Sequence, residues 1–198
     1  MFSRLPALAL GLALLVSPGL RAQEASWRID PLHSAARFSI RHLMISTVRG
    51  DFGGVTGAVR YDPANPTKAT VEASIDCSTL NTGTPKRDAE MKGPEFFDVK
   101  RYPFMKFKST KVEIAGEGRL KVAGDLTINA TIRPVVLDVE GPSPSVKDAQ
   151  GRTKIGLSAT TRINRKDYGI TWNEILESGG FALADEVSII LDIELIKN

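Results

Sequence analysis

The stretch Glu186–Lys197, EVSIILDIELIK, alternates between apolar and polar residues over most of its length. One parity is entirely apolar and consists of Val187, Ile189, Leu191, Ile193 and Leu195. The opposite parity carries Asp192 and Glu194. Because successive side chains of a β-strand point to opposite faces of a sheet, this alternation predicts a strand with one buried face.

The same period of two recurs along the chain. It is found in TVEASIDCS (70–78), in KIGLSATTRI (154–163) and in GRLKVAGDLTINATIRPVVLDVEG (118–141), where a turn at 129–131 separates two runs. Turn-forming strings such as YDPANP, GEG and GPSPS separate the runs at hairpin-like intervals. The chain is therefore predicted to be all-β, with about eight antiparallel strands closed into a barrel, because closure leaves no unpaired edge.

Two segments break the period of two, PKRDAEMKGPEFF (85–97) and WNEILESGG (172–180). Each is predicted to form one or two helical turns. A barrel of eight strands is either filled by side chains or holds one small ligand. The alternation alone does not choose between these two interiors.

Residues 1–22 predict a cleavable secretory signal peptide. They combine a basic residue, Arg4, with an apolar run and a final small residue, Ala22. The apolar run is too short to cross roughly 30 Å of hydrocarbon as a helix, so we expect no stable membrane insertion. Residues 23–198 are expected to form one exported domain.

The charge of this domain is close to balanced. Without Arg4 and Arg21, 24 Lys and Arg remain against 23 Asp and Glu. The near-neutral balance and the lack of a basic run give no electrostatic footprint for nucleic acid. Cys77 is the only cysteine, so no internal disulfide can form. Its parity with Ile75 predicts a buried, unreactive thiol.

The two histidines, His33 and His42, do not predict a metal site. On one regular strand, at about 3.3 Å per residue, they would lie nearly 30 Å apart and on opposite faces. His33 stands at a strand entrance, where we expect a hydrogen-bonding role in a turn. His42 shares the parity of Ile40, which leaves two interpretations: a core histidine with a local hydrogen bond, or a polar group that meets a ligand head group.

No catalytic centre is predicted. The chain lacks a Gly-x-Ser-x-Gly elbow, a phosphate-binding loop and a dinucleotide fingerprint. A cluster of acids in one predicted helical segment consists of Asp88, Glu90, Glu95 and Asp98. The bases interleaved with them are Lys86, Arg87 and Lys92, so ordinary surface pairing is the expected interpretation.

Four blocks of the sequence carry a family resemblance. They are WRIDPLHSAARFSIRHLMISTVRGDFGGVTGAVRYDP (27–63), IDCSTLNTGTPKRDAEMKGPEFFDVKRYPFMKFKST (75–110), GDLTINATIRPVVLDV (124–139) and INRKDYGI (163–170). In this order they resemble the YceI-like family, the lipid- or polyisoprenoid-binding proteins of the bacterial periplasm. One departure is Asn129-Ala130, where many members have a glycine, and it affects only the geometry of that turn.

The resemblance implies a lipocalin-like barrel whose elongated apolar interior takes up an isoprenoid-type amphiphile, such as a polyprenyl compound or a quinone. It implies a periplasmic location, no catalytic step and no cofactor. Parity then assigns the candidate ligand-binding residues, which are Phe38, Ile40, His42, Phe52, Val71, Ala73, Ile75, Cys77, Phe107, Leu126, Ile128, Leu137, Ile155, Leu157 and Ala159.

Small residues on the inward parity bear on whether a lumen exists. They are Ala36, Ala73, Cys77, Gly124 and Ala159. Either they leave open space, or larger neighbours interdigitate with them as in a dense core. The first interpretation favours a lipid carrier, because each buried methylene saves about 0.8 kcal/mol and a prenyl tail is almost insoluble in water.

Other functions remain open at this stage. The alternative to a carrier is a stress-related structural or interaction protein with a filled barrel and no stoichiometric ligand. A hydrolase or isomerase would need a constellation of residues that the sequence does not display. Ile190 and Ile196 lie on the outward parity of the last strand, which leaves room for an isologous homodimer.

Overall fold

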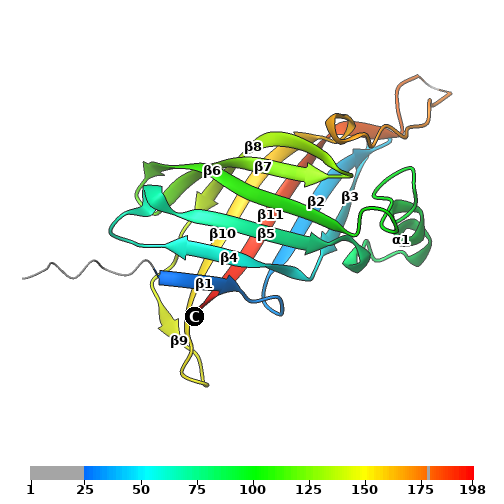
Figure 1. The fold of residues 1–198 in the computed structure, drawn as a ribbon. Coiled ribbons are helices and arrows are strands. Elements are labelled where there is room, and N and C mark those ends of the chain that lie inside the picture. Colours follow the sequence, from blue (N-terminus) through cyan, green and yellow to red (C-terminus); the bar gives the residue numbers. More distant parts are fainter. Residues whose placement is uncertain (1–24, 178) are drawn as a thin grey trace, which may run out of the picture.

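The computed structural model describes residues 25–177 and 179–198, which form a closed antiparallel β-barrel (Figure 1). The strands are β1 (Ala25–Ile29), β2 (Ala35–His42), β3 (Ser46–Phe52), β4 (Val55–Tyr61), β5 (Thr70–Asp76), β6 (Phe104–Gly116), β7 (Arg119–Ile128), β8 (Thr131–Glu140), β9 (Val146–Lys147), β10 (Thr153–Asn164) and β11 (Leu183–Lys197). The helical elements are α1 (Pro85–Met91) and the 3-10 turns η1 (Pro66–Lys68), η2 (Cys77–Thr79) and η3 (Arg165–Tyr168). The predicted signal peptide lies outside the described residues. None of the helices described is long and apolar enough to span a membrane.

Eight strand positions close the barrel, which confirms the predicted fold. Their order around the ring is β11, β1, β4, β5, β6, β7, β8 and β10, and the pairing of β10 with β11 completes the circle. β2 pairs with the same edge of β11 as β1 does, so β1 and β2 form one broken strand along it. β3 continues β4 in the same way, because β3 pairs with β2 and β4 pairs with β1.

The break between β1 and β2 is a loop that bulges from the barrel wall. Asp30 N donates to Glu194 O at 2.8 Å, and Ser34 Oγ accepts from Glu194 N at 3.0 Å. The backbone of β11 therefore stays satisfied across the gap in the ladder. The loop also brings Asp30 and His33 close to the Glu194 carboxylate on the outer face of the barrel.

The register of β11 places its apolar parity inside the barrel. Leu195 is opposite Ile29 on one side and Ile155 on the other, and it is fully buried. On the outward parity, Ile190 is 45% exposed, as expected, but Ile196 is only 2% exposed. The expectation of a surface-exposed Ile196 is wrong, because it lies in the crowded part of the outer wall between Arg28 and Lys154. The homodimer stays a prediction, and of the two isoleucines proposed for its interface only Ile190 is exposed.

The turn between β7 and β8 keeps hairpin geometry without a glycine. Asn129 and Ala130 have φ values of 48° and 60°, the positive values that a two-residue hairpin turn requires. Asparagine tolerates this conformation. Its side-chain Nδ2 also donates to Phe96 O at 2.5 Å, which ties the hairpin to the segment after α1.

Only one of the two predicted helical segments is helical. α1 begins at Pro85, which suits the first position of a helix because its missing N–H has no partner there. In the second segment, the described residues contain no helix. Ile175 instead forms an isolated antiparallel bridge with Phe181. Positive φ values at Gly179 and Gly180 turn the chain back on itself, which explains why the helical prediction is wrong.

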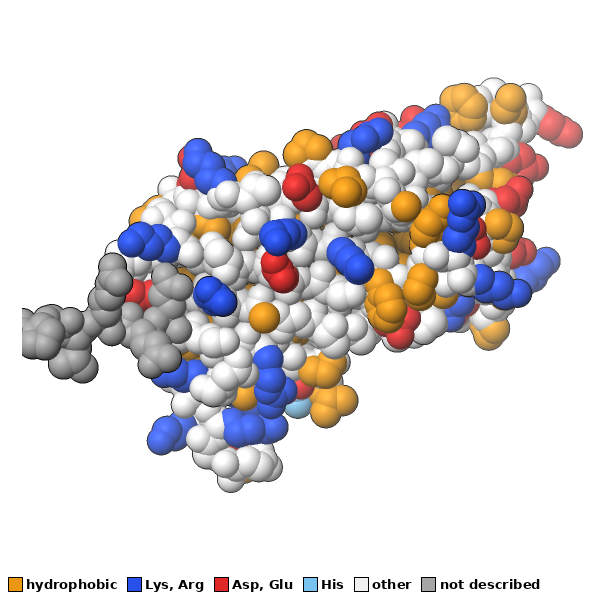
Figure 2. Space-filling view, viewed as in Figure 1, with side chains coloured by type: hydrophobic (Ala, Val, Ile, Leu, Met, Phe, Trp, Pro, Cys, Tyr) orange, Lys and Arg blue, Asp and Glu red, His pale blue; other side chains and the backbone are white. Residues whose placement is uncertain are grey.

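The two ends of the barrel differ. α1 lies beside the end at which β2 and β3 meet (Figure 1). In Figure 2, charged side chains of both signs are spread over the visible wall, whereas apolar side chains gather at the end that carries α1. The cavity described next is lined by residues of this end, such as Phe97, and by residues farther along the strands, such as Val59 and Val122.

Candidate functional site

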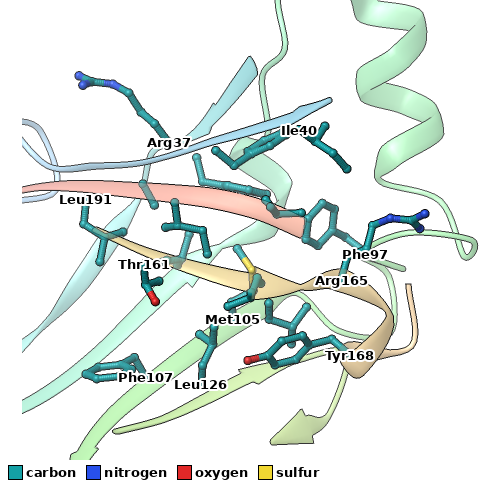
Figure 3. A pocket seen from close by; sticks show the side chains of 18 of the residues that line it. Arg37, Ile40, Phe97, Met105, Phe107, Leu126, Thr161, Arg165, Tyr168 and Leu191 are labelled. Atoms are coloured by element: carbon teal, nitrogen blue, oxygen red, sulfur yellow. The ribbon is translucent and has the colours of Figure 1, made fainter. Parts of the chain in front are cut away.

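The barrel encloses a cavity of about 790 Å³ (Figure 3). Its walls are mainly aliphatic and aromatic side chains from the inward parity of the strands. This volume lies within the range of about 300–1,000 Å³ that is typical of small-molecule sites. The barrel is therefore not filled by its own side chains.

Most residues that parity assigned to the interior line this cavity. The thirteen that do so are Phe38, Ile40, His42, Phe52, Val71, Ala73, Ile75, Phe107, Leu126, Ile128, Leu137, Leu157 and Ala159. Whether they bind a ligand stays a prediction.

Cys77 and Ile155 are buried but do not line the cavity, so their placement there is wrong. Cys77 lies in η2, where the chain has already left strand β5, so the strand parity no longer applies to it. Ile155 pairs with Leu195, which does not line the cavity either. The end of the barrel away from α1 is filled by the side chains of Trp27, Ile155 and Leu195.

Small inward residues leave space at some positions and not at others. Ala36, Ala73 and Ala159 line the cavity. Gly124 does not, because the ring of Phe107 lies against it: a Cβ at Gly124 would stand 2.4 Å from Phe107 Cζ. At this one position a large neighbour interdigitates with a small residue, as a dense core requires.

At the α1 end the cavity is lined by aromatic residues that the strand pattern did not identify. Phe97 packs edge-on against Phe52 with ring centroids 5.2 Å apart, and Phe96 packs against Trp172 at 5.4 Å. Phe96, Phe97 and Trp172 all line the cavity. The signal in the sequence is the pair Phe96-Phe97 after α1, which belongs to the second block of the family resemblance.

The charged residues of this segment do not form the expected surface pairs. Asp88 accepts hydrogen bonds from Thr82, and Arg87 donates to the hydroxyl and carbonyl oxygens of Thr82. No ion pair links the acids and bases of residues 85–98, all of which the structure describes. The charges therefore fix the loop that precedes α1. Glu90 and Glu95 are also among the residues that line the cavity at this end.

Arg165 brings a buried guanidinium to the cavity wall. It is 4% exposed, and it donates to three backbone carbonyls, those of Ala184, Ile170 and Trp172, at 2.7–2.9 Å. These bonds hold the chain after η3 against the start of β11. Burial lowers the pKa of Arg165, while the negative charge of Asp185 opposes this shift. Its Nη2 has no hydrogen-bond partner.

Tyr168, at the other end of η3, is 2% exposed and lines the same cavity. Figure 3 shows Tyr168 among the side chains that line the cavity. The hydroxyl has no hydrogen-bond partner, and burial raises its pKa to about 12. Sequence reasoning missed both Arg165 and Tyr168 as cavity residues, because η3 has no strand parity from which to assign them.

The two histidines lie in different parts of the molecule. His42 lines the cavity at the α1 end and pairs with Leu183 in register. His33 lies outside the barrel in the loop between β1 and β2, as expected of a turn residue, and its Nδ1 is 3.0 Å from Asp30 Oδ2. The prediction that the histidines lie far apart and share no site agrees with this placement.

Asp30, His33 and Glu194 nevertheless form a compact group that no sequence spacing revealed. Their ligand atoms lie within 4.8 Å of one another, which is close enough for a metal ion. The ammonium of Lys154 occupies the position of a cation instead, at 2.5 Å from Glu194 Oε1 and 3.2 Å from Asp30 Oδ2. Burial of Asp30 opposes ionisation, but hydrogen bonds from His33, the Leu32 N–H and Lys154 hold its pKa at about 2. Asp30, His33, Lys154 and Glu194 therefore form an ion-paired cluster on the outer wall.

A closed antiparallel barrel around one large apolar cavity defines the class of lipocalin-like ligand-enclosing barrels. Within this class the family is also established. The model of the YceI-like domain matches residues 27–195, and the chain belongs to that family.

Relatives and solved structures agree with this assignment. A UPF0312 protein of Vibrio cholerae is 34% identical over 165 residues, which cover 82% of this chain and 87% of that protein. BcnA of Burkholderia cenocepacia has the same fold, with a TM-score of 0.71 at 22% identity, over 84% of this chain and 98% of that one. A polyisoprenoid binding domain from Saccharophagus degradans, implicated in plant cell wall breakdown, matches with a TM-score of 0.61 at 15% identity, over 87% and 98%.

Proposed function

We propose that this protein binds an isoprenoid-type lipid, a polyprenyl compound or a quinone, inside its barrel and carries it through the periplasm. The observation that supports this most strongly is the apolar cavity of about 790 Å³ inside the barrel. A second observation is that a domain of the same fold, from Saccharophagus degradans, is a polyisoprenoid binding domain.

The physical argument for a carrier rests on the cost of hydrating a prenyl tail. Each methylene group transferred from water to an apolar interior gains about 0.8 kcal/mol, so a tail of several isoprene units gains many kilocalories per mole. Such a gain requires contact along the whole tail. The inward faces of the strands provide that contact, because aliphatic residues such as Val71, Leu126 and Leu157 line the cavity.

Binding without chemistry is part of the proposal. Within residues 25–177 and 179–198, the ring of His42 forms no side-chain hydrogen bond that would orient it as a general base. Arg165, the buried cation of the cavity wall, is committed to three backbone carbonyls. This arrangement supports a binding protein in which the polar groups hold either the fold or the ligand.

The periplasmic location rests on the sequence of the N-terminus, residues 1–22, and on the family. An exported carrier suits a chain with a single cysteine, since no disulfide is needed to hold the barrel together. The thiol of Cys77 is buried, and burial raises its pKa to about 11. Oxidising surroundings therefore have little access to a thiolate at this position.

The direct test is mass spectrometry of a solvent extract of protein purified from its native periplasm. We expect a long isoprenoid in near-stoichiometric amount, and we expect added isoprenoids to raise the melting temperature of stripped protein. A ligand that binds only the folded state must stabilise it. Repeated extracts without such a lipid, together with an unchanged melting temperature, would refute the carrier and favour a structural or interaction protein.

A further inference from the structure

Two loops at the α1 end of the barrel join into one exposed apolar surface. They are the turn between β2 and β3, residues 43–45, and the loop before β11, of which residues 172–177 and 179–182 are described. Leu43 N donates to Ala182 O at 2.7 Å, which holds the two loops side by side. The exposed apolar side chains of these loops, which we call the apolar tip, are those of Met44, Ile45, Ile175 and Phe181.

The side chains of the tip are large and lie together. Ile45 is 79% exposed, and Ile175 is 78% exposed. Ile175 and Phe181 are directly opposite each other in an antiparallel bridge, so their side chains lie on the same side of it. Single exposed apolar residues are common, but a cluster of them marks a surface that meets a protein or a membrane.

The turn between β2 and β3 consists of residues that do not suit its conformation. Leu43 and Met44 have φ values of 50° and 59°, and Ile45 N donates to His42 O at 3.2 Å. A hairpin turn with two positive φ values favours asparagine, aspartate or glycine, and bulky residues adopt it rarely. Folding alone therefore does not account for a leucine and a methionine here. Strained backbone of this kind is concentrated at functional sites.

The apolar tip lies beside the place where the cavity reaches the protein surface. The lining residues that are themselves exposed are Arg37, Ser46, Glu90 and Glu95. The last three lie at the α1 end, and Ser46 directly follows Ile45 of the tip. On the other loop, Trp172 lines the cavity and Ile175 follows it after one turn of chain. A ligand that passes through this opening therefore passes the tip.

The size of the tip favours a lipid bilayer over a protein partner. A stable protein interface involves about 20–30 residues on each side, whereas the tip offers four side chains. A second copy of the chain would therefore gain too little contact. A fluid bilayer needs no matching shape, because the hydrophobic effect is not directional.

The charges around the tip are mixed. Arg41 donates to Met44 O at 2.7 Å, and Lys166 Nζ lies 5.7 Å from the centre of the Phe181 ring. Glu174 and Glu177 belong to the same loop as Ile175. Because the two signs offset each other, the tip does not select an anionic membrane. It fits a zwitterionic bilayer, which it enters through its apolar side chains.

We propose that the apolar tip inserts into the surface of a zwitterionic phospholipid bilayer and holds the opening of the cavity against the membrane while a lipid passes between them. This inference rests on the proposed function and names the surface on which the carrier is loaded and unloaded. The contact is superficial and reversible, since only four side chains enter the bilayer and none of the described helices could span it.

The test measures vesicle binding and ligand binding separately on the purified mature protein. The probe for docking is a vesicle of dioleoylphosphatidylcholine, and co-sedimentation gives the partition coefficient. The probe for the cavity is phylloquinone, a quinone with an isoprenoid tail, added without vesicles. The variant is Ile45→Ser, and its matched control is Ile114→Ser, which replaces an isoleucine that is 62% exposed at the opposite end of the barrel.

We expect Ile45→Ser to lower the partition coefficient about tenfold, because burial of an isoleucine side chain favours the bound state by at least that factor. Ile114→Ser should leave the coefficient unchanged. A higher salt concentration should not release the protein, since insertion rather than charge holds it. Phylloquinone binding and the melting temperature should stay unchanged in both variants, because neither isoleucine lines the cavity or belongs to the core.

Equal partition coefficients for Ile45→Ser and the wild-type protein would overturn the docking surface. The same follows if the wild-type protein takes up phylloquinone but does not bind vesicles. A dimer in sedimentation velocity that Ile45→Ser dissociates would assign the tip to a second copy of the chain instead. A wild-type protein that docks through Ile45 but takes up no isoprenoid would overturn the proposed function and leave the docking surface standing.

Discussion

Ala73→Trp tests directly whether a lipid tail occupies the barrel. Ala73 lies on the inward face of β5, where it lines the cavity and pairs with Gly57 on one side and Phe107 on the other. Its methyl group leaves the lumen open at this level. An indole at the same position would extend into the cavity, because the strand parity directs its Cβ inward.

The magnitude follows from the length of tail that the indole displaces. If it excludes one isoprene unit of five carbons, at about 0.8 kcal/mol each, binding loses about 4 kcal/mol. Since 1.4 kcal/mol corresponds to a factor of ten, the dissociation constant should rise by roughly 10³. The ligand-free protein should keep its stability, because the indole enters a space that is open and apolar.

The control is Ser74→Trp. Ser74 is the next residue of the same strand, so its side chain points to the opposite face of the sheet. It pairs with Thr56 and Lys106 in register, and the substitution should alter neither lipid uptake nor melting temperature by much. We would measure both quantities for both variants by lipid titration and thermal unfolding. A filled interior would instead make Ala73→Trp an overpacked core, with strain of about 1–3 kcal/mol in the stripped protein and no selective loss of binding. That result would refute the reasoning.

Three further predictions concern the wall of the barrel. Lys154→Ala should lower the free energy of unfolding several times more than Lys108→Ala, because it strands the buried carboxylate of Asp30 while Lys108 belongs to an exposed pair; equal losses in urea titrations would contradict this. Because the pKa of Asp30 is about 2 in the folded state and near 4 when unfolded, its contribution is fully present above about pH 5 and is lost as the pH falls toward 2. Asp30→Asn should flatten that part of the stability curve, which unfolding at a series of pH values would show. Cys77, with a pKa of about 11, should resist iodoacetamide at pH 8 until the protein unfolds, and rapid labelling of the native state would argue against its burial.

The fold was predictable because the alternation of apolar and polar residues defines the buried face of a strand whichever strands it pairs with. The alternation in Glu186–Lys197 places Leu191 and Leu195 on the buried face of the sheet, whatever the neighbouring strands are. Closure then follows from the number of strands with one apolar parity. The same argument identified thirteen cavity-lining residues, since parity is a property of each strand alone.

Parity fails where the chain leaves its strands. Cys77 continues the pattern of β5 on paper, but η2 begins at that residue and turns it away from the cavity. Arg165 and Tyr168 lie in η3, and Phe97 lies in the segment after α1, so no strand pattern extends to them. The segment 172–180 misled in the opposite direction, because its composition suggested a helix while its glycines adopt positive φ values.

The ion-paired cluster on the outer wall could not be predicted from the sequence for a different reason. Asp30 and Lys154 are separated by 124 residues, and Lys154 and Glu194 by 40. Only the register of β10 on β11, with the loop between β1 and β2 folded over it, brings them together. Local patterns contain no information on such a register when many strands have similar alternation.

Where the barrel stays open depends on pairs of neighbours rather than on small residues alone. Gly124 is covered by the ring of Phe107, so the smallest residue of the inward parity leaves no space. Leu191 instead pairs with Ala36 on one side and Ala159 on the other, so at this level one branched side chain stands between two methyl groups. All three line the cavity. In such a row, two of the three adjacent strands project only a methyl group into the barrel, so the cavity is wider there. A flexible branched tail fits such a stretch better than a flat, rigid ring does, which agrees with the proposed isoprenoid ligand.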